Sequence, residues 1–418
     1  MKLMKTIMKL ILILIGSVLL GTAFLYLVFL LPTDGMSRHA KDAVTAFSIE
    51  RNYPMMDGTE ATQLDNWTDS LMLLNALFEK GGTRTLEQVL DVYQPGYESG
   101  NPTESFILYE DGTKPLYTTS YSRYWHGYLV ILKPLLTVMG YLGIRGLNRI
   151  LQTLLMLATA VILWRRHGLR PILPLAAAYG FLRPGAVAFS MQFSTVFYPS
   201  MIAVLIMALF YDQVNKGNRF LYLFLLVGII TNYLDFLTYP IAGLGIPMGM
   251  WLCLSRGKSW QYQAKQVILG SMCWGFGYFG MWIGKWVIGS ILLHKSIIAD
   301  ALTQAQFRSS STVGDITVSR GLVILRNLYT GTGGRLWLFL LVPVIMLAMG
   351  LWQSKWNWKK LALQIIPYLL VAAMPFVWYA VMLNHSFVHH WFTYRGLAVS
   401  VFAVVGIGVM CGDTERIV

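Results

Sequence analysis

Residues 10–31 read LILILIGSVLLGTAFLYLVFLL, an uninterrupted apolar run that follows Lys2, Lys5 and Lys9. About 20 apolar residues are enough for a helix to cross the hydrocarbon core of a bilayer. The run is too long for the apolar part of a signal peptide and lacks a small-residue cleavage site. We therefore predict an uncleaved first transmembrane helix, with its basic end in the cytoplasm.

The composition points the same way for the whole chain. Of its 418 residues, 56% are hydrophobic and 13% are charged, against roughly 25% charged residues in a soluble protein. The net charge is +13, but Lys and Arg gather in short stretches beside apolar runs. This pattern is typical of membrane topology and lipid headgroup contact rather than nucleic-acid binding. The three cysteines have no paired spacing, so neither a disulfide framework nor a zinc site is expected.

Ten apolar segments are predicted to be transmembrane helices. Their approximate ranges are 9–32, 147–164, 171–190, 196–213, 219–234, 237–254, 266–291, 335–352, 361–383 and 396–411. This assignment places the basic clusters at 165–170 and 355–360 in the cytoplasm, as membrane proteins prefer. Residues 124–140 are short and contain Lys133 and Pro134, so we interpret them as an amphipathic helix in the membrane interface.

The expected fold is an all-α polytopic membrane protein with a long first extracytoplasmic loop that carries short interfacial helices. Its parts are the first transmembrane helix (1–32), the first extracytoplasmic loop (33–146), transmembrane helices two to seven (147–291), a second extracytoplasmic loop (292–334), and transmembrane helices eight to ten with a cytoplasmic tail (335–418). Within the first loop we expect helices near 64–80 and 85–93.

Acidic side chains are conspicuous on the outer side. The stretch 64–70, LDNWTDS, carries Asp65 and Asp69 four residues apart, so on a helix both carboxylates would face the same way. Such a pair can act as a general base, bind a cation or cap a helix. Asp34, just past the first span, is a rival base. Asp235, at the outer end of the span 219–234, would cap the next helix or line a cavity.

An aromatic stretch, YSRYWHGY at 121–128, opens the interfacial segment. An aromatic belt with a snorkelling Arg123 accounts for Tyr124 and Trp125. It does not call for His126, which we therefore retain as a candidate site residue.

A third polar stretch, NHSFVHHWFTYR at 384–395, places three histidines before Tyr394 and Arg395. His385 and His389 are one helical turn apart and could pair on a metal, but no HExxH pattern or cysteine partner supports zinc. Hydrogen bonding, or an anion site made with His390 and Arg395, fits better, and simple interfacial decoration is the alternative. The second outer loop adds further basic residues: Lys295, Arg308, Arg320, Arg326 and Arg335. Its residues 318–328 belong either to a solvated loop or to a segment lying on the membrane.

The layout resembles the GT-C class of integral-membrane glycosyltransferases, which use polyprenyl-phosphate-linked sugars. The resemblance rests on the first span, the acidic outer loop, the aromatic stretch from Trp125 to Gly140, and Arg145 with Arg149 before the next span. The class has an acidic residue in the first outer loop as catalytic base or metal ligand, and Asp65 and Asp69 match it best. The paired Asp-Glu of its mannosyltransferase branch is absent here, so the resemblance allows a divalent cation without requiring one.

The resemblance implies a bacterial plasma-membrane enzyme, acting on the extracytoplasmic face, that moves a sugar with inversion from a polyprenyl-phosphate donor to a glycan, lipid or protein acceptor in cell-envelope polysaccharide biosynthesis. Asp69 is the first choice of base, Asp65 the second, and His126 would orient the base or bind phosphate. The expected substrate-binding residues are Arg123, Tyr124, Trp125, Asp235, Lys295, His385, His389, His390, Tyr394 and Arg395. A transporter or flippase for a lipid-linked glycan is the alternative function, followed by a non-catalytic scaffold.

Overall fold

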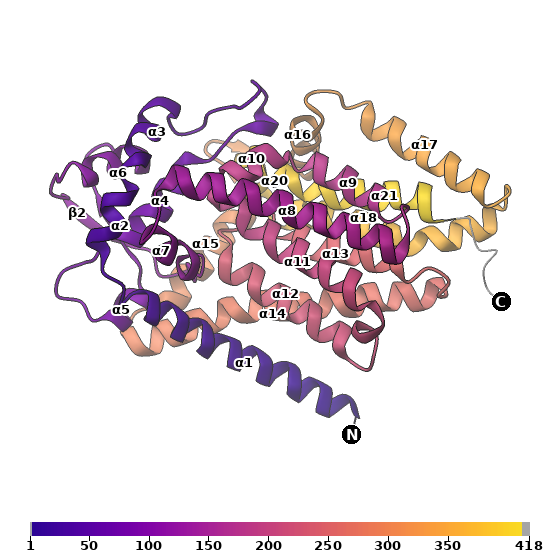
Figure 1. Ribbon diagram of the computed structural model, residues 1–418, viewed down its shortest axis with the longest axis horizontal. Coiled ribbons are helices and arrows are strands. Elements are labelled where there is room, and N and C mark those ends of the chain that lie inside the picture. The colour runs from indigo at the N-terminus through magenta and orange to yellow at the C-terminus, as the bar shows by residue number, and fades with distance from the viewer. Residues whose placement is uncertain (1, 412–418) are drawn as a thin grey trace.

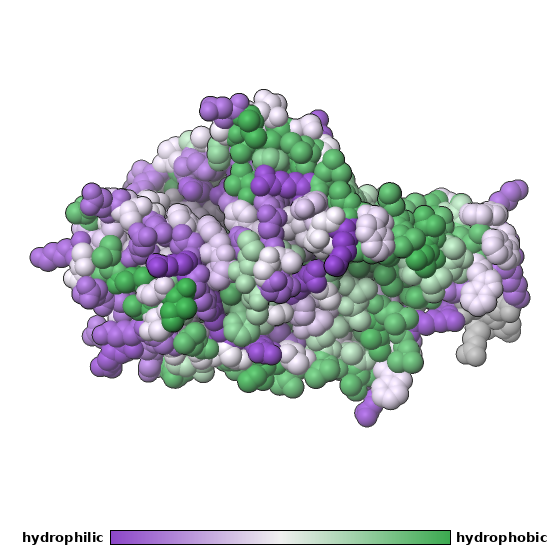
Figure 2. All heavy atoms as spheres, turned by 90° about the horizontal axis from the view of Figure 1, so that it is seen from above, coloured by the Kyte–Doolittle hydropathy of each residue, from purple (hydrophilic) through white to green (hydrophobic). Residues whose placement is uncertain are grey.

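The computed structural model describes residues 2–411, and the predicted cytoplasmic tail at 412–418 lies outside the described residues. Within residues 2–411 the chain is almost entirely helical. The long helices run side by side, and the short elements of the first outer segment gather at one end of them (Figure 1). A space-filling view shows most of the hydrophilic residues at that same end, hydrophobic residues over much of the rest, and a smaller group of hydrophilic residues at the opposite end (Figure 2). This segregation is what a helical protein embedded in a bilayer requires.

Six helical stretches in the described chain are long and apolar enough to cross a membrane. They are α1 (Lys2–Val28), α8 (Tyr141–His167), α11 (Met191–Val214), α14 (Trp260–Leu293), α18 (Trp358–Val381) and the run His390–Met410, which comprises α20 (His390–Thr393), η2 (Tyr394–Leu397) and α21 (Ala398–Met410). Four apolar helices are shorter: α9 (Ile172–Phe181), α12 (Arg219–Leu234), α13 (Ile241–Leu254) and α17 (Leu338–Gln353). The described chain is therefore helical as predicted, with helices apolar enough for a membrane, and the ten predicted segments overlap these helices. The predicted segment 171–190 is divided, because Arg183 with φ +59° separates α9 from α10 (Pro184–Phe189). That the chain crosses a membrane ten times stays a prediction.

Helices α12 and α14 approach one another closely because glycine lies at their contact. A Cβ placed on Gly228 would lie 2.2 Å from the carbonyl oxygen of Trp274, and one on Gly277 would lie 2.3 Å from that of Leu225. Small residues of this kind let helix backbones meet inside membranes.

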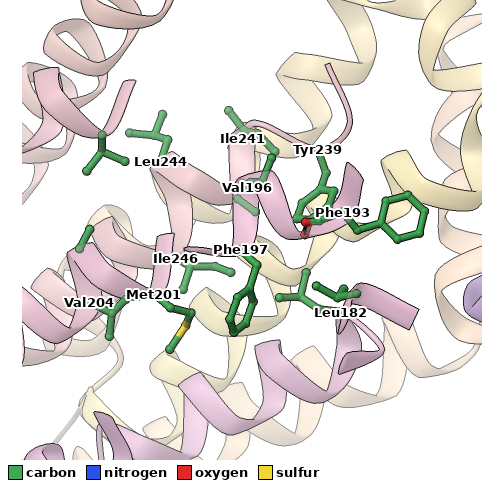
Figure 3. Close-up of a cluster of buried hydrophobic side chains, with 14 of the residues drawn as sticks. Leu182, Phe193, Val196, Phe197, Met201, Val204, Tyr239, Ile241, Leu244 and Ile246 are labelled. Carbon is green, nitrogen blue, oxygen red and sulfur yellow. Dashed lines mark hydrogen bonds between the residues drawn. The ribbon is translucent and has the colours of Figure 1, made fainter. Parts of the chain in front are cut away.

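A buried apolar cluster lies where the end of α9 meets α11 and the segment that leads into α13. Leu182, Phe193 and Val196 pack there with further apolar residues of the same region (Figure 3). The hydroxyl of Tyr239 donates to the carbonyl oxygen of Phe193 at 2.5 Å, which satisfies the polar atom within this apolar cluster. This packing fixes the start of α11, where the site described below is built.

The first outer segment folds into short helices and one hairpin. Its elements are α2 (Thr33–Ala40), α3 (Asp42–Glu50), η1 (Glu60–Thr62), α4 (Asn66–Leu77), α5 (Thr85–Leu90), α6 (Pro102–Glu110), α7 (Leu129–Leu136), and the antiparallel strands β1 (Tyr93–Gly96) and β2 (Tyr117–Ser120), with Tyr93 opposite Ser120. The predicted helices at 64–80 and 85–93 correspond to α4 and α5, and both are shorter than predicted. The interfacial segment 124–140 holds only the eight-residue α7. The helix α8 begins at Tyr141, inside the segment predicted as loop.

The later outer segments are also folded. They contain α15 (Ile297–Ser309), the small hairpin β3 (Thr312–Val313) and β4 (Ile316–Thr317), α16 (Arg320–Thr332) and α19 (Leu383–Val388), while α10 (Pro184–Phe189) precedes α11. The main-chain N–H of Asn384 donates to the carbonyl oxygen of Ser310 at 3.0 Å, and the Asn384 amide donates to that of Thr312 at 2.6 Å. These bonds join the second outer segment to the histidine-rich stretch.

Candidate functional site

A cavity of about 170 Å³ lies at the start of α11. The first outer segment, the second outer segment and the histidine-rich stretch all contribute residues to it. Acidic, cationic and aromatic side chains line it together. The lining residues are Tyr53, Asp65, Trp67, Thr68, Leu71, Tyr121, Gln192, Phe236, Arg308, His385, His389, Trp391 and Phe392. Of the residues that the sequence nominated for the site, Asp65, His385 and His389 line this cavity.

Asp65 is both a helix cap and a cavity residue. Its Oδ1 accepts a hydrogen bond from the Thr68 N–H and its Oδ2 accepts one from the Thr68 hydroxyl, each at 3.0 Å. The side chain is 2% exposed. Burial raises the pKa of Asp65 to about 7, and the neighbouring Asp69 adds to the rise while the Thr68 bonds oppose it. A carboxyl group with a pKa near neutrality is suited to accept a proton.

Asp69 occupies a different environment. It accepts hydrogen bonds from the Tyr141 hydroxyl at 2.8 Å and from the first N–H groups of α11, Met191 at 3.0 Å and Gln192 at 3.1 Å. Burial raises the pKa of Asp69 to about 6, against the effect of Arg145. Asp65 precedes α4 as its N-cap, with φ −122° and ψ 70°, whereas Asp69 lies in its first turn. The two carboxylates are close enough for Asp69 to raise the pKa of Asp65, but they accept hydrogen bonds from different partners. Asp69, the first choice of base, joins α4 to α8 and α11 instead of lining the cavity.

Arg308 and His385 form a directed pair on the wall of the cavity. Arg308 Nη1 lies 2.8 Å from His385 Nδ1, and His385 Nε2 lies 2.7 Å from the carbonyl oxygen of Leu237. Because a carbonyl oxygen only accepts, Nε2 carries the proton and Nδ1 accepts from the guanidinium. Burial and the neighbouring His389 and Arg308 hold the pKa of His385 well below its usual range. The pair thus places one permanent positive charge beside a neutral imidazole.

Several polar atoms around the cavity have no partner among residues 2–411. They are His389 Nδ1, Gln192 Oε1, Trp391 Nε1 and Arg308 Nε, all buried. His389 stacks on Phe392 with ring centroids 5.1 Å apart, and burial lowers the pKa of His389 to about 3. Buried polar groups are nearly always hydrogen-bonded in folded proteins. Unpaired donors and acceptors on residues that line the cavity therefore favour a polar ligand.

Aromatic rings form another part of the wall. Tyr53 and Trp67 lie nearly parallel, with centroids 6.3 Å apart and 10° between planes, and Trp391 meets Tyr53 edge-on at 5.5 Å. Tyr121 stacks on Phe236 at 6.2 Å. Flat apolar faces next to polar atoms are typical of small-molecule sites.

His390, Tyr394 and Arg395, from the same 384–395 stretch, make hydrogen bonds within the protein and do not line the cavity. Arg395 is fully buried and donates to the carbonyl oxygens of Leu182, Trp391 and Ala61, and the Tyr394 hydroxyl also donates to Ala61. His390 Nδ1 lies 2.8 Å from the Thr330 hydroxyl and 3.5 Å from Glu60. The predicted anion site of His390 with Arg395 is therefore not formed, because carbonyl oxygens already occupy the guanidinium.

Most of the aromatic stretch 121–128 is packed within the protein and does not line the cavity. His126 Nε2 donates to the Tyr121 carbonyl oxygen at 2.9 Å, and burial lowers the pKa of His126 to about 3. Trp125 donates to the Met281 carbonyl oxygen at 2.7 Å and Tyr124 is buried, while Arg123 pairs with Asp300 at 3.1 Å. His126 thus holds the cavity residue Tyr121 instead of lining the cavity itself.

Three further residues that the sequence analysis nominated do not line the cavity. Asp235 accepts from the Thr238 N–H at 2.9 Å and from the hydroxyls of Thr238 and Thr195, and burial raises its pKa to about 6. Lys295 pairs with the buried Asp91 at 2.5 Å. Asp34 lies in the first turn of α2 and does not line the cavity.

The sequence did not distinguish Arg308, Gln192, Tyr53 or Trp67 as site residues. Arg308 is one of several basic residues in its segment, and no motif marks it. In the part of the chain that the structure describes, no group of three or more His, Cys, Asp or Glu side chains could hold a metal ion. No step below uses the divalent cation that the GT-C resemblance allows. Comparison of the chain with known protein families, with curated proteins and with solved structures finds no match.

Proposed function

We propose that this protein is a membrane glycosyltransferase, which moves a sugar from a polyprenyl-phosphate donor to an acceptor hydroxyl at the outer face of a bacterial plasma membrane. The observation that carries the proposal is the shared cavity of Asp65 and Arg308 at the polar end of the bundle. A base and a fixed cation in one enclosed site are what transfer from a phosphate leaving group needs. The proposal includes ten crossings, which place this cavity outside.

The proposed reaction is a single displacement. The acceptor hydroxyl loses its proton to the Asp65 carboxylate as its oxygen forms a bond to the anomeric carbon. The bond from that carbon to the phosphate oxygen breaks, and its electron pair leaves with the polyprenyl phosphate. Arg308 stabilises the negative charge that develops on the departing oxygen. Inversion at the anomeric carbon follows from attack opposite the leaving group.

The environment of each group supports its role. With a pKa of about 7, Asp65 is ionised in a large fraction of molecules at neutral pH and still binds a proton well. Arg308 keeps its charge, and its neutral partner His385 does not compete for the phosphate. The cavity of about 170 Å³ is smaller than the roughly 300 Å³ of sites for larger ligands. It suits one sugar ring against the wall of Tyr53, Trp67 and Trp391, with the lipid chain outside.

The test is transfer by the purified full chain in nanodiscs. A panel of radiolabelled polyprenyl-phosphate sugars is supplied, and the release of free polyprenyl phosphate is measured. Asp65→Asn is expected to lower release by at least about 100-fold, whereas Asp111→Asn, which removes a carboxylate from the exposed loop after α6, leaves it unchanged. A folded Asp65→Asn protein with full turnover removes the base from the proposal. Movement of the intact donor between leaflets without cleavage would support the transporter alternative.

A further inference from the structure

Helix α16 (Arg320–Thr332) buries polar residues and exposes apolar ones. Asn327 and Thr330 are buried with Val323. On the opposite side Leu322, Leu325 and Tyr329 are 44%, 53% and 56% exposed. A helix that lies on a protein surface in water shows the opposite arrangement, with its apolar stripe against the core.

The buried face of α16 is fixed by hydrogen bonds to the elements beside the cavity. The Asn327 amide donates to the Ser386 carbonyl oxygen at 2.9 Å and accepts from the Thr393 hydroxyl at 2.7 Å. The Thr330 hydroxyl contacts His390 at 2.8 Å and Glu60 at 3.2 Å. These contacts hold the polar face of α16 against the rest of the protein. Leu322 and Leu325, on the opposite face, therefore remain exposed.

The outward stripe continues into the next apolar segment. Trp337 is 56% exposed, and Leu340 of α17 is 75% exposed. Figure 1 draws α16 nearly end-on, so the helix lies across the direction of the long helices α1 and α14. A helix that crosses the bundle axis and joins a lipid-facing segment lies at the depth where the apolar and polar parts of a bilayer meet.

Three arginines lie on or just after α16, and Glu60 is an acidic side chain that contacts the helix, at Thr330. Arg320 and Arg335 are exposed at the two ends of α16, and the Arg326 guanidinium lies 4.3 Å over the ring of Phe387. Residues 316–411 contain no Asp or Glu. Exposed arginines beside an apolar stripe attract the phosphates of anionic lipids.

We propose that α16 is an interfacial helix of the outer leaflet, with Leu322, Leu325 and Tyr329 among the acyl chains and with Arg320 and Arg335 bound to anionic phospholipid headgroups. This inference makes no use of glycosyl transfer, and it takes only the outer side of the membrane from the topology proposed above. It also replaces the solvated loop that the sequence allowed for residues 318–328.

The depth of α16 is tested by lipid quenching on the full chain. A fluorophore is attached through Leu325→Cys in nanodiscs that contain doxyl-labelled phosphatidylcholine. Leu116→Cys, in the first outer segment, is the control, because Leu116 is 71% exposed there. The three native cysteines are buried, so labelling is directed to the new one. We expect several-fold stronger doxyl quenching at position 325 and stronger quenching by aqueous iodide at position 116. Equal iodide quenching at the two positions overturns the proposal.

The headgroup preference is tested in mixed nanodiscs of phosphatidylglycerol and phosphatidylcholine. Doxyl-phosphatidylglycerol should quench the label at position 325 more strongly than doxyl-phosphatidylcholine at the same mole fraction. The double variant Arg320→Gln/Arg335→Gln should remove this preference, with about a five-fold loss per arginine in the enrichment of the anionic lipid. Arg84→Gln, another exposed arginine in the first outer segment, should keep it. Equal quenching by the two lipids in the unmodified protein refutes headgroup binding even if the leucines insert.

Discussion

Arg308 donates from Nη1 to Nδ1 of His385 at 2.8 Å, while Nε2 of the same imidazole donates to the carbonyl oxygen of Leu237 at 2.7 Å. The Leu237 backbone, with φ +71°, thereby fixes which nitrogen of His385 carries its proton. A protonated His385 would present an N–H to the guanidinium and repel it. The pair consequently holds Arg308 in one orientation in the cavity and leaves its charge undiminished.

Arg308→Lys should lower sugar release from the polyprenyl-phosphate donor by about 100-fold. Lysine keeps the charge but lacks the planar fork that can donate to His385 and to a phosphate together. The measurement is kcat for the purified chain in nanodiscs, with Arg84→Gln as the matched removal of an exposed arginine outside the cavity. Unchanged kcat in a folded Arg308→Lys protein would argue against a role of this side chain in leaving-group stabilisation.

The rate of transfer should rise with pH through about 7. Below its pKa Asp65 is protonated and cannot take the acceptor proton, so kcat/KM falls on the acid side. The profile of kcat/KM between pH 5 and 9 checks this. The residual rate of Asp65→Asn should lack the inflection, and an inflection that survives in this variant would assign it to another group.

Asp65→Asn should also raise the thermal stability of the protein at alkaline pH. Burial raises the folded-state pKa of Asp65 from 3.8 to about 7, so the folded protein binds more protons than the unfolded chain between these values. The contribution of Asp65 to stability is therefore present at pH 4 and is lost as pH rises to 7. An asparagine keeps the helix cap without the buried charge. Melting at pH 8 and at pH 4.5 should show a gain in Tm for the variant that is larger at pH 8, and a gain of equal size at both values would contradict the assignment.

Asp69→Asn should destabilise the fold. One carboxylate accepts from Tyr141, Met191 and Gln192, and an asparagine amide cannot accept on its nitrogen. Leaving buried donors unpaired costs about 1–3 kcal/mol each. Melting of the variant in detergent, followed by tryptophan fluorescence, measures this loss. If Asp69 were instead the base, the variant would melt normally and lose its activity at every temperature.

Gly228→Ala should weaken the packing of α12 on α14. The new Cβ would lie 2.2 Å from the Trp274 carbonyl oxygen, and backbone must move to admit it. Overpacking of this kind costs about 1–3 kcal/mol. Gly275→Ala on α14 is the control, because a Cβ there meets nothing within 4 Å. A loss of monodisperse protein on heating is expected for the first variant alone.

The helical bundle could be predicted from sequence because crossing the hydrocarbon core of a bilayer needs a long apolar run. Six of the described helices reach that length, and four apolar helices are shorter. The residues of the candidate site were harder to predict from the sequence. Asp65 is the N-cap of α4 and Asp69 lies in its first turn, so the two carboxylates accept from different partners although the Asp69 N–H donates to the Asp65 carbonyl oxygen at 3.0 Å. His385 and His389 do lie together, with centroids 4.9 Å apart, because the helical spacing holds there. No local motif distinguishes Arg308, because it reaches the cavity through long-range contacts: its own bond to His385 and the bonds of Ser310 and Thr312 with Asn384.

The walls of the cavity come from residues 53–71, 121, 192, 236, 308 and 385–392. The last of these stretches leads directly into the final apolar run of the chain, His390–Met410. On the proposed topology, the earlier segments are inserted before His385 and His389 can reach Asp65. A nascent chain that lacks residues 385–392 lacks part of the cavity wall. The proposed transfer activity would therefore arise only late in biosynthesis, after most of the chain has entered the membrane.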